Sequence, residues 1–332
     1  MIDTHPRKIF FMMRAAWYER TGPAREVLQV GELPEPEPGP GEVRVRLTRS
    51  GVNPGDVKKR EGWLGGGMRY PRVVPHSDGA GVVDAAGPGA DPARIGRRVW
   101  VYGAQSYRPS GTAAAATCVP QDLAVDLPDG VSDELGAALG IPGITAHRAV
   151  FGDGPVRDRV VLVHGVLGAV GSLAAQLATW GGARVVGTVR HTADVAGVPT
   201  VALDAPDAAA RIRELAPDGV DRIVEVALSA NADLDAEVAA PDAVIAAYAS
   251  PDPRPALPFW PLLFANVTLR LLGSDDFPAA AKQQAARDLT TAAAAGALRV
   301  PVAAVYPLDE IATAHEAVEA GSPTGRILLA IA

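Results

Sequence analysis

The sequence predicts an α/β protein in which a mostly β domain is combined with a doubly wound parallel sheet of six strands. Three observations lead to this prediction. Short β-type runs separated by glycine and proline fill the chain from residue 14 to about residue 130. After residue 135, strand-like runs alternate with alanine-rich helical stretches, as βαβ units do. A glycine-rich turn at 163–172 joins a strand to a helix within this second part.

The β-type runs of the first part differ in composition. Residues 43–47 alternate as V-R-V-R-L, 79–83 is a run of small residues, and 98–102 reads R-V-W-V-Y. Such short runs between turn signals indicate a compact, mostly β domain. Residues 1–12 are interpreted as an extension that precedes a strand starting near Arg14.

The second part contains six strand candidates, which is the number that a full dinucleotide-binding fold requires. They are expected at 159–163, 184–188, 200–203, 222–226, 243–248 and 267–272, with helices at 169–180 and 208–215 among those between them. A helix (279–295), a strand (300–305), a helix (308–320) and a last strand (326–331) follow. These closing elements are expected to return to the first domain.

Composition excludes several classes of function. The net charge of −7 and the pI near 5.4 argue against a surface for nucleic acid or anionic membrane. Cys118 is the only cysteine, so neither an internal disulfide nor a four-thiolate zinc site can form. No apolar run reaches the roughly 18 to 20 residues that span a bilayer. We therefore expect a cytoplasmic protein.

The strongest single motif is V-H-G-V-L-G-A-V-G-S at 163–172. Gly165 and Gly168 permit a tight turn, Gly168 leaves room for a pyrophosphate, and Gly171 lets the helix pack closely on the strand. The first turn of the helix offers free N–H groups and a positive dipole end to the phosphates. Glycines also mark ordinary turns, but the strand–turn–helix context within βαβ units favours a dinucleotide site.

The end of the second strand in this part indicates which nicotinamide cofactor binds. Sites that prefer NAD usually carry an acid there, bonded to the ribose 2′-OH. This chain has Thr188, Arg190 and His191 instead, and the nearest acid, Asp194, comes several residues later. Because Arg can bind a 2′-phosphate with its guanidinium fork, we expect NADPH. The alternative is that Arg190 is only a solvated surface residue.

Further motifs follow one another along the chain. They are a strand at 13–18, G-V-N-P at 51–54, P-H-S-D-G-A-G-V-V at 75–83, G-R-R-V at 96–99, a Pro- and Thr-Ala-containing segment at 139–150, and G-R-I-L-L at 325–329. Together with the glycine turn, their content and order resemble the zeta-crystallin-like quinone oxidoreductases and enone reductases. This branch belongs to the medium-chain dehydrogenase/reductase superfamily, and the resemblance covers nearly the whole chain from residue 13.

The resemblance implies a GroES-like substrate domain (13–138 and 276–332) that is interrupted by a Rossmann NADPH-binding domain (139–275). It implies hydride transfer from NADPH to a quinone or an α,β-unsaturated carbonyl, in a homodimer. Zinc alcohol dehydrogenases of the superfamily have a ligand cysteine where this chain has Ser50. His76 has no cysteine partner, so we expect no metal.

The resemblance also implies which residues surround the nicotinamide and the acceptor. Asn53 is a candidate to donate to an oxyanion or to hold the ribose, and otherwise is a turn residue before proline. Lys58 stands where many members have Tyr, and as in the enone reductases it could stabilise an enolate; otherwise it belongs to a solvated charged turn. The candidate cofactor-binding residues are Thr145, Leu167, Gly168, Ala169, Val170, Thr188, Arg190, His191, Ser229, Tyr248, Ala249, Ser250 and Leu272.

Two other functions stay open at this stage. An NADPH-binding protein with little catalysis would bind the cofactor but reduce no acceptor, as a structural or regulatory relative of zeta-crystallin. A zinc alcohol dehydrogenase would contain stoichiometric metal. The sequence does not distinguish a quinone from an enone as the substrate, and it does not identify the proton donor.

Overall fold

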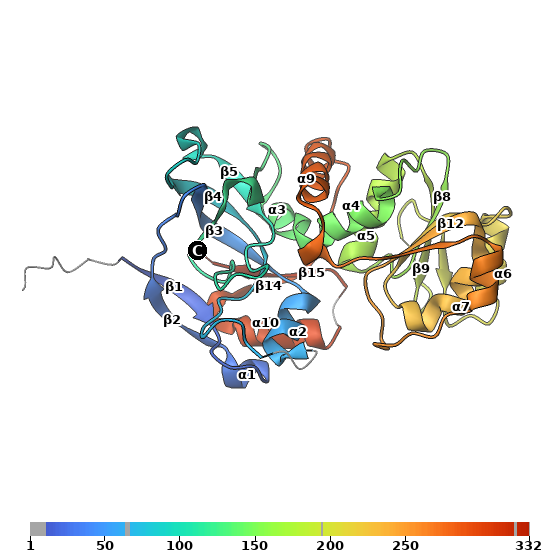
Figure 1. The fold of residues 1–332 in the computed structure, drawn as a ribbon, viewed down its shortest axis with the longest axis horizontal. Helices are drawn as coiled ribbons and strands as arrows, with labels where there is room; N and C mark the ends of the chain where they lie inside the picture. Colours follow the sequence, from blue (N-terminus) through green and yellow to red (C-terminus); the bar gives the residue numbers. More distant parts are fainter. Residues whose placement is uncertain (1–10, 64–66, 194, 322–323, 332) are drawn as a thin grey trace, which may run out of the picture.

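The protein has two lobes, each built on its own sheet (Figure 1). The computed structural model describes residues 11–63, 67–193, 195–321 and 324–331. Most of the expected N-terminal extension, residues 1–10, therefore lies outside the described residues.

The second lobe contains a six-stranded sheet in the order β10-β9-β8-β11-β12-β13, and all of its neighbouring strands are parallel. The strands are β8 (Val160–Val163), β9 (Arg184–Val189), β10 (Thr200–Ala202), β11 (Val220–Glu225), β12 (Ala239–Ala247) and β13 (Thr268–Leu271). This confirms the predicted Rossmann fold. The strand order reverses between β8 and β11, and ligands of such sheets bind outside the carboxyl ends of the strands at that point.

Helices alternate with these parallel strands. The helix α4 (Ile141–Phe151) precedes β8, and the connections between later strands contain α5 (Ala169–Trp180), α6 (Ala208–Leu215), α7 (Leu228–Val238) and α8 (Phe259–Phe264). The bounds of α5 and α6 match the prediction from the sequence. Within the described residues, the chain has no helix with the length and apolar character needed to cross a membrane.

The first lobe is mostly β, as predicted. Its larger sheet has the order β14-β15-β3-β4-β5-β7, and β6 also pairs with β3. Its elements are β1 (Met12–Trp17), α1 (Ala24–Val27), β2 (Gln29–Pro34), β3 (Glu42–Val52), α2 (Pro54–Glu61), β4 (Asp78–Ala86), β5 (Arg98–Val101), β6 (Ala116–Pro120), β7 (Ala124–Asp126), α3 (Asp133–Leu139), α9 (Ala279–Ala294), β14 (Val302–Pro307), α10 (Ile311–Glu319) and β15 (Arg326–Ala330). The last strand, β15, pairs antiparallel with β3, so the end of the chain does return to the first sheet.

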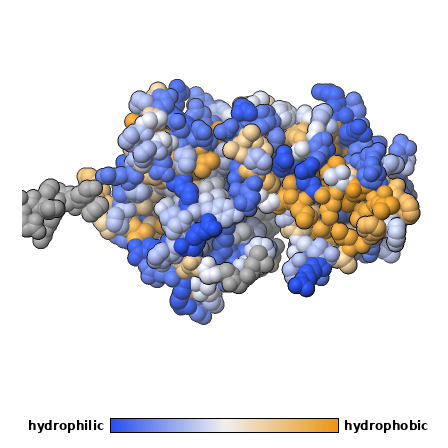
Figure 2. All heavy atoms as spheres, in the orientation of Figure 1, coloured by the Kyte–Doolittle hydropathy of each residue, from blue (hydrophilic) through white to orange (hydrophobic). Residues whose placement is uncertain are grey.

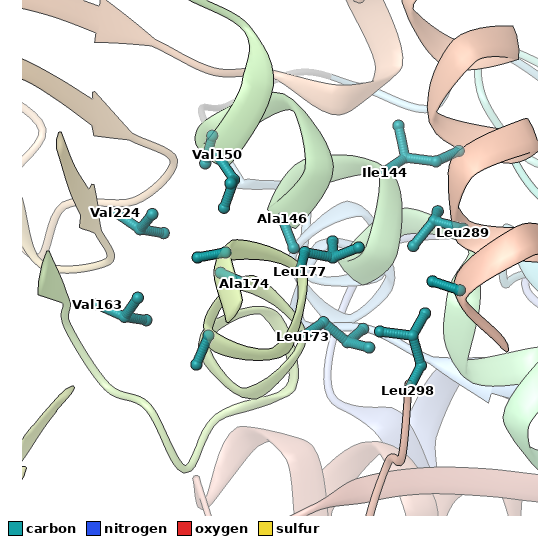
Figure 3. Packing of buried hydrophobic residues seen from close by; sticks show 14 of the residues in the cluster. Ile144, Ala146, Val150, Val163, Leu173, Ala174, Leu177, Val224, Leu289 and Leu298 are labelled. Carbon is teal, nitrogen blue, oxygen red and sulfur yellow. The ribbon is translucent and has the colours of Figure 1, made fainter. Parts of the chain in front are cut away.

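One hydrophobic core continues from one lobe into the other. Figure 3 shows Leu173 and Leu177 of α5 packing beside Ile144 of α4 and Leu289 of α9. Trp100 of β5 belongs to the same cluster, and its indole N–H donates to Thr290 of α9 at 3.1 Å. The lobes therefore meet through packed side chains, and the domain boundaries at 138/139 and 275/276 stay predictions.

Candidate functional site

The turn after β8 has the backbone geometry that its glycines predict. Gly165 has φ +63°, and its carbonyl accepts the Gly168 N–H at 2.8 Å. A Cβ on Gly171 would stand 2.2 Å from the Gly165 carbonyl oxygen, so only glycine lets α5 approach this closely. Gly168 is exposed at the start of α5, where the first N–H groups of a helix lack partners within it. This cradle fits a pyrophosphate.

Most of the other predicted cofactor residues lie at the carboxyl ends of the parallel strands. Leu167, Val170, Tyr248 and Leu272 are half-buried and pack against the central core. Ser229, in the first turn of α7, meets Ser250 in the segment after β12, because the Ser229 N–H donates to the Ser250 hydroxyl at 3.3 Å. The Ala249 carbonyl accepts the Leu228 N–H at 3.2 Å. The fold thus brings residues that follow four of the strands, β8, β11, β12 and β13, to one edge of the sheet.

The three residues predicted to select NADPH differ in exposure. Thr188 is fully buried, and its hydroxyl lies 2.9 Å from Nδ1 of His164. Arg190 is exposed just beyond β9, whereas His191 lies 2.9 Å from the Asp204 carboxylate. The sequence analysis missed Asp204, because it follows a different strand, β10. Arg190 and His191 are therefore both open to solvent, where they can meet a phosphate, while the Thr188 side chain faces the interior.

Thr145 and Tyr248 have polar groups that face the protein. The Thr145 hydroxyl donates to the Ile141 carbonyl of its own helix at 2.7 Å, and the residue is 5% exposed. Burial, with a further contribution from the Glu225 charge, raises the pKa of the Tyr248 phenol. The phenol therefore stays neutral across the physiological range, and both contacts with the cofactor stay predictions.

The Asn53 amide, a candidate donor to a substrate oxyanion or partner of the ribose, is held on both sides. Its Nδ2 donates to the Asp78 carboxylate at 2.8 Å, and its Oδ1 accepts from Arg326 at 2.8 Å. Asn53 is 3% exposed at the start of α2. The structure thus gives the amide a buried bridging role, and donation to a substrate would depend on the second N–H of Nδ2.

Asp78 connects this amide to the other lobe. Its second carboxylate oxygen accepts the Ile141 N–H, at the start of α4, at 2.8 Å. Burial raises its pKa to about 6, although the Arg326 charge and the Asn53 hydrogen bond oppose that rise. The sequence did not predict this role, because Asp78 stands out there only as part of the motif at 75–83. A carboxylate that is completely buried points to such a role, and the burial of Asp78 becomes visible only in the folded structure.

Lys58 and Lys59 point to different surroundings. Lys58 is exposed, with its Nζ 4.9 Å from the centroid of the Trp63 ring. Lys59 forms an ion pair with Asp275 at 2.9 Å and donates to Gln105 at 3.2 Å. Successive residues on a helix lie about 100° apart, so the sequence could not tell which lysine meets the other segments. Within the described residues, the Lys58 ammonium forms no ion pair with a carboxylate. The Lys59 ammonium instead links α2 to the segment after β13.

The residues at the position of a catalytic zinc do not fit that metal. The Ser50 hydroxyl bonds His76 at 2.9 Å and Thr112 at 2.7 Å. His76 also contacts His315, with 2.9 Å between the two Nε2 atoms. Cys118 is buried elsewhere, with its Sγ 3.7 Å from the Pro36 carbonyl oxygen. The imidazole of His76 is thus already bonded on both sides, and no thiolate stands beside it.

Comparisons with known proteins agree with this architecture. Residues 39–129 match the family described as alcohol dehydrogenase GroES-like domain, and residues 181–329 match the one described as zinc-binding dehydrogenase. Human quinone oxidoreductase is 29% identical over 96% of this chain and 98% of its own.

Solved structures resemble the whole chain. A mycobacterial protein solved in complex with NADPH is 29% identical, with a TM-score of 0.80 over 96% of this chain and 99% of its own. An NAD-dependent alcohol dehydrogenase is 27% identical, with a TM-score of 0.85 over 96% of this chain and 100% of its own. With the glycine turn and the GroES-like lobe, these matches imply a nicotinamide cofactor and a small-molecule substrate. The chain is an NAD(P)-dependent oxidoreductase, and it is similar to the quinone oxidoreductases of the medium-chain dehydrogenase/reductase superfamily.

Proposed function

We propose that this protein is an NADPH-dependent reductase that transfers hydride to a quinone or to the activated C=C bond of an α,β-unsaturated carbonyl, without zinc. The observation that carries the proposal is the exposed start of α5 at Gly168, together with exposed Arg190, which directly follows the neighbouring strand β9. The human relative, named a quinone oxidoreductase, supports the class of acceptor. The occupied surroundings of Ser50 and His76 support chemistry without a metal.

NADPH is favoured over NADH by charge. Arg190 offers a guanidinium where the 2′-phosphate of a bound dinucleotide would lie. The relative solved with NADPH supports this preference, whereas the NAD-dependent relative shows that the fold accommodates both cofactors. The Asp204 carboxylate opposes a phosphate, but its contact with His191 reduces that effect when the imidazole is protonated.

In this proposal the cofactor supplies the hydride, and the chain positions the reactants and stabilises charge. An enone that accepts hydride at its β-carbon builds negative charge on its carbonyl oxygen. Lys58 carries an exposed ammonium that could meet this oxygen, and we assign it the stabilising role. Asn53 is assigned a supporting role, because its amide holds Asp78 and Arg326 in place.

The cofactor preference is tested by measuring oxidation of NADPH and NADH with a benzoquinone and with a simple enone. Arg190→Ala should raise the KM for NADPH about tenfold or more, because a hydrogen bond to a charged group is lost, and should leave the KM for NADH unchanged. Arg184→Ala is the matched control, since Arg184 is exposed at the opposite end of β9. Equal use of the two cofactors by the native protein would contradict the NADPH assignment.

Lys58 is tested with the enone as acceptor. Lys58→Met should lower kcat while the KM for NADPH stays constant, and Lys58→Arg should restore part of the rate because it keeps the cation. If Lys58→Met reduces the enone at the native rate, the ammonium has no role in catalysis. If the native protein binds NADPH but reduces neither acceptor, the alternative of a cofactor-binding protein with little catalysis takes its place.

A homodimer is proposed on the basis of an apolar surface. Trp260 and Phe264 of α8 are 63% and 80% exposed, and Leu271 of β13 is 71% exposed. Figure 2 shows extensive hydrophobic surface on this lobe. Because β13 ends the sheet, its outer edge is available to a second copy of the chain. Phe264→Glu should give monomers in light scattering, while the control Phe11→Glu, equally exposed but elsewhere, should not.

A further inference from the structure

His164 connects three elements beneath the glycine turn. It directly precedes Gly165, and its side chain is completely buried. Its Nδ1 lies 2.9 Å from the Thr188 hydroxyl on β9, and its Nε2 lies 2.8 Å from the Asp235 carboxylate on α7. The ring therefore ties the start of the turn to the end of the neighbouring strand and to a helix behind them.

Two buried carboxylates face this single imidazole. Besides Asp235, the Glu225 carboxylate at the end of β11 lies 3.5 Å from Nε2, and both acids are 0% exposed. Glu225 also accepts N–H groups from Ala227 and from the Asn231 side chain. The second oxygen of Asp235 has no hydrogen-bond partner among the described residues. With both carboxyl groups ionised, a neutral ring would leave two negative charges side by side without a positive charge.

The surroundings favour the protonated ring. Burial lowers the pKa of the His164 imidazole, but the Asp235 hydrogen bond and the charges of Asp235 and Glu225 outweigh burial, so the pKa is raised. Burial raises the pKa of Glu225 as well, opposed by the His164 charge. The imidazolium then donates to Thr188 and to Asp235 at once.

We propose that His164 is a positioning residue for the nicotinamide cofactor, which holds the turn against β9 and compensates the Asp235 and Glu225 charges so that an anionic dinucleotide can bind above them. The proposal rests on the cofactor-binding part of the proposed function and not on the identity of the acceptor. It gives the buried imidazole a role in affinity, although no atom of His164 is exposed to touch the cofactor.

The electrostatic step follows from the position of the ring in the chain. The pyrophosphate of a dinucleotide carries negative charge, and the turn that would hold it begins one residue after His164. Opposite charges inside a protein are screened far less than in water. Without the imidazolium, the two carboxylates would oppose the phosphates, and the free N–H groups of α5 would bind them more weakly.

The mechanical step concerns Thr188. The Val166 N–H donates to the Thr188 carbonyl at 3.1 Å, so backbone and side chain of this residue both hold the turn. Arg190, which is assigned to the 2′-phosphate, follows two residues later. A shift of the Thr188 side chain would therefore move the turn and the arginine relative to each other.

A bound divalent cation could also compensate the negative charges of Glu225 and Asp235. One nitrogen of His164 and one oxygen each from Glu225 and Asp235 lie within 4.8 Å of one another. Two observations favour the proton. The 2.8 Å between Nε2 and Asp235 is a hydrogen-bond distance, and donors from Ala227 and Asn231 already occupy Glu225.

Equilibrium binding of NADPH and of NADH, measured by fluorescence without any acceptor, tests the proposal. His164→Asn should weaken both about tenfold. The double variant His164→Asn with Asp235→Asn should regain part of the affinity, because it removes one uncompensated charge. A purely structural role predicts instead that the double variant binds no better. His147→Asn is the matched control, because His147 makes an equally short contact with Asp288 away from the turn.

Thr188→Val serves as the milder variant if His164→Asn fails to fold, and it should raise the KM for both cofactors while kcat stays constant. Unchanged affinity in folded His164→Asn and Thr188→Val would overturn the proposal and leave the reductase assignment intact. Retention of one equivalent of divalent metal, with affinity lost on chelation, would also overturn it. Native affinity without reduction of any acceptor would support the inference and contradict the proposed reaction.

Discussion

His164, under the glycine turn, and the pair His76 and His315, in the other lobe, are all fully buried, yet they differ in charge. Burial lowers the pKa of each of the three imidazoles. Two carboxylates reverse that effect at His164. His76 and His315 stack on each other with ring centroids 5.1 Å apart, and they have hydroxyl groups and arginines for neighbours.

The pKa of His315 falls to about 3, from burial first and the Arg60 charge second, and that of His76 falls well below its usual value. The surroundings thus favour neutral rings in the pair of the substrate lobe, and they favour the protonated ring at His164 in the nucleotide lobe. The difference teaches that burial sets only the cost of a charge, and that the neighbouring groups decide whether the charge is kept. A charged ring suits the lobe that must hold an anion.

The largest effect is expected on breaking the charged cluster. Asp235→Ala leaves the imidazolium with only the more distant Glu225, and removing one partner of a buried pair costs about 3 kcal/mol or more of unfolding free energy. Denaturation by urea, followed by circular dichroism without cofactor, measures this. Asp288→Ala is the control, because its contact with His147 has the same length but its carboxyl side chain is 29% exposed. An equal loss in both variants would contradict the comparison.

Opposite slopes of stability against pH are the next effect. Between pH 6.5 and about 3, His315 binds a proton in the unfolded chain but not in the folded protein. The free energy of unfolding therefore decreases as the pH falls through this range. Above pH 6.5, folded His164 keeps a proton that the unfolded chain releases, so its contribution falls as the pH rises. Each proton contributes a slope of about 1.4 kcal/mol per pH unit.

Single variants separate the two slopes. His315→Leu should flatten the acid side of the profile, and His164→Asn should flatten the alkaline side, in urea denaturation repeated over a series of pH values. If both variants flatten the same side of the profile of stability against pH, His164 and His315 do not differ in charge as described. Unfolding free energies of each variant relative to the native protein give the result directly, because the other titrating groups are common to both.

Local pattern was enough for much of the fold. The run 163–172 predicted the turn after β8, and the bounds of α5 and α6 followed from alanine-rich stretches between apolar strands. Strand starts were harder. β12 begins at Ala239 and not at 243, because it continues through Pro241 and through Asp242 at φ +62°, which no apolar run could indicate.

Parts of the candidate site that lie within one short segment could be predicted from the sequence. Parts that form where distant segments meet could not. The glycine cradle lies within a few residues, so its spacing shows it. The Asn53 amide is held by Asp78 and Arg326, which are 25 and 273 residues away. Likewise 71 residues separate His164 from Asp235. Such partners become visible only when the sheets have placed them together.

The smallest effect is expected at a third histidine contact with an aspartate, His191 with Asp204, whose side chains are 84% and 55% exposed. Its 2.9 Å distance nearly equals that of the buried pair, but surface pairs contribute only about 0 to 1 kcal/mol. Asp204→Asn should therefore leave the unfolding free energy within about 1 kcal/mol of the native value.

The same substitution should still change cofactor preference. Asp204 lies beside the end of β9, because its N–H donates to the Arg190 carbonyl at 3.3 Å. Removing its negative charge should raise the preference for NADPH over NADH by about two- to threefold, in ratios of kcat/KM. Asp207→Asn, which removes an exposed charge paired with Arg211 nearby, should not. If Asp204→Asn cost as much stability as Asp235→Ala, geometry and not burial would set the strength of these pairs, and the large cost expected for Asp235→Ala could not be attributed to its burial.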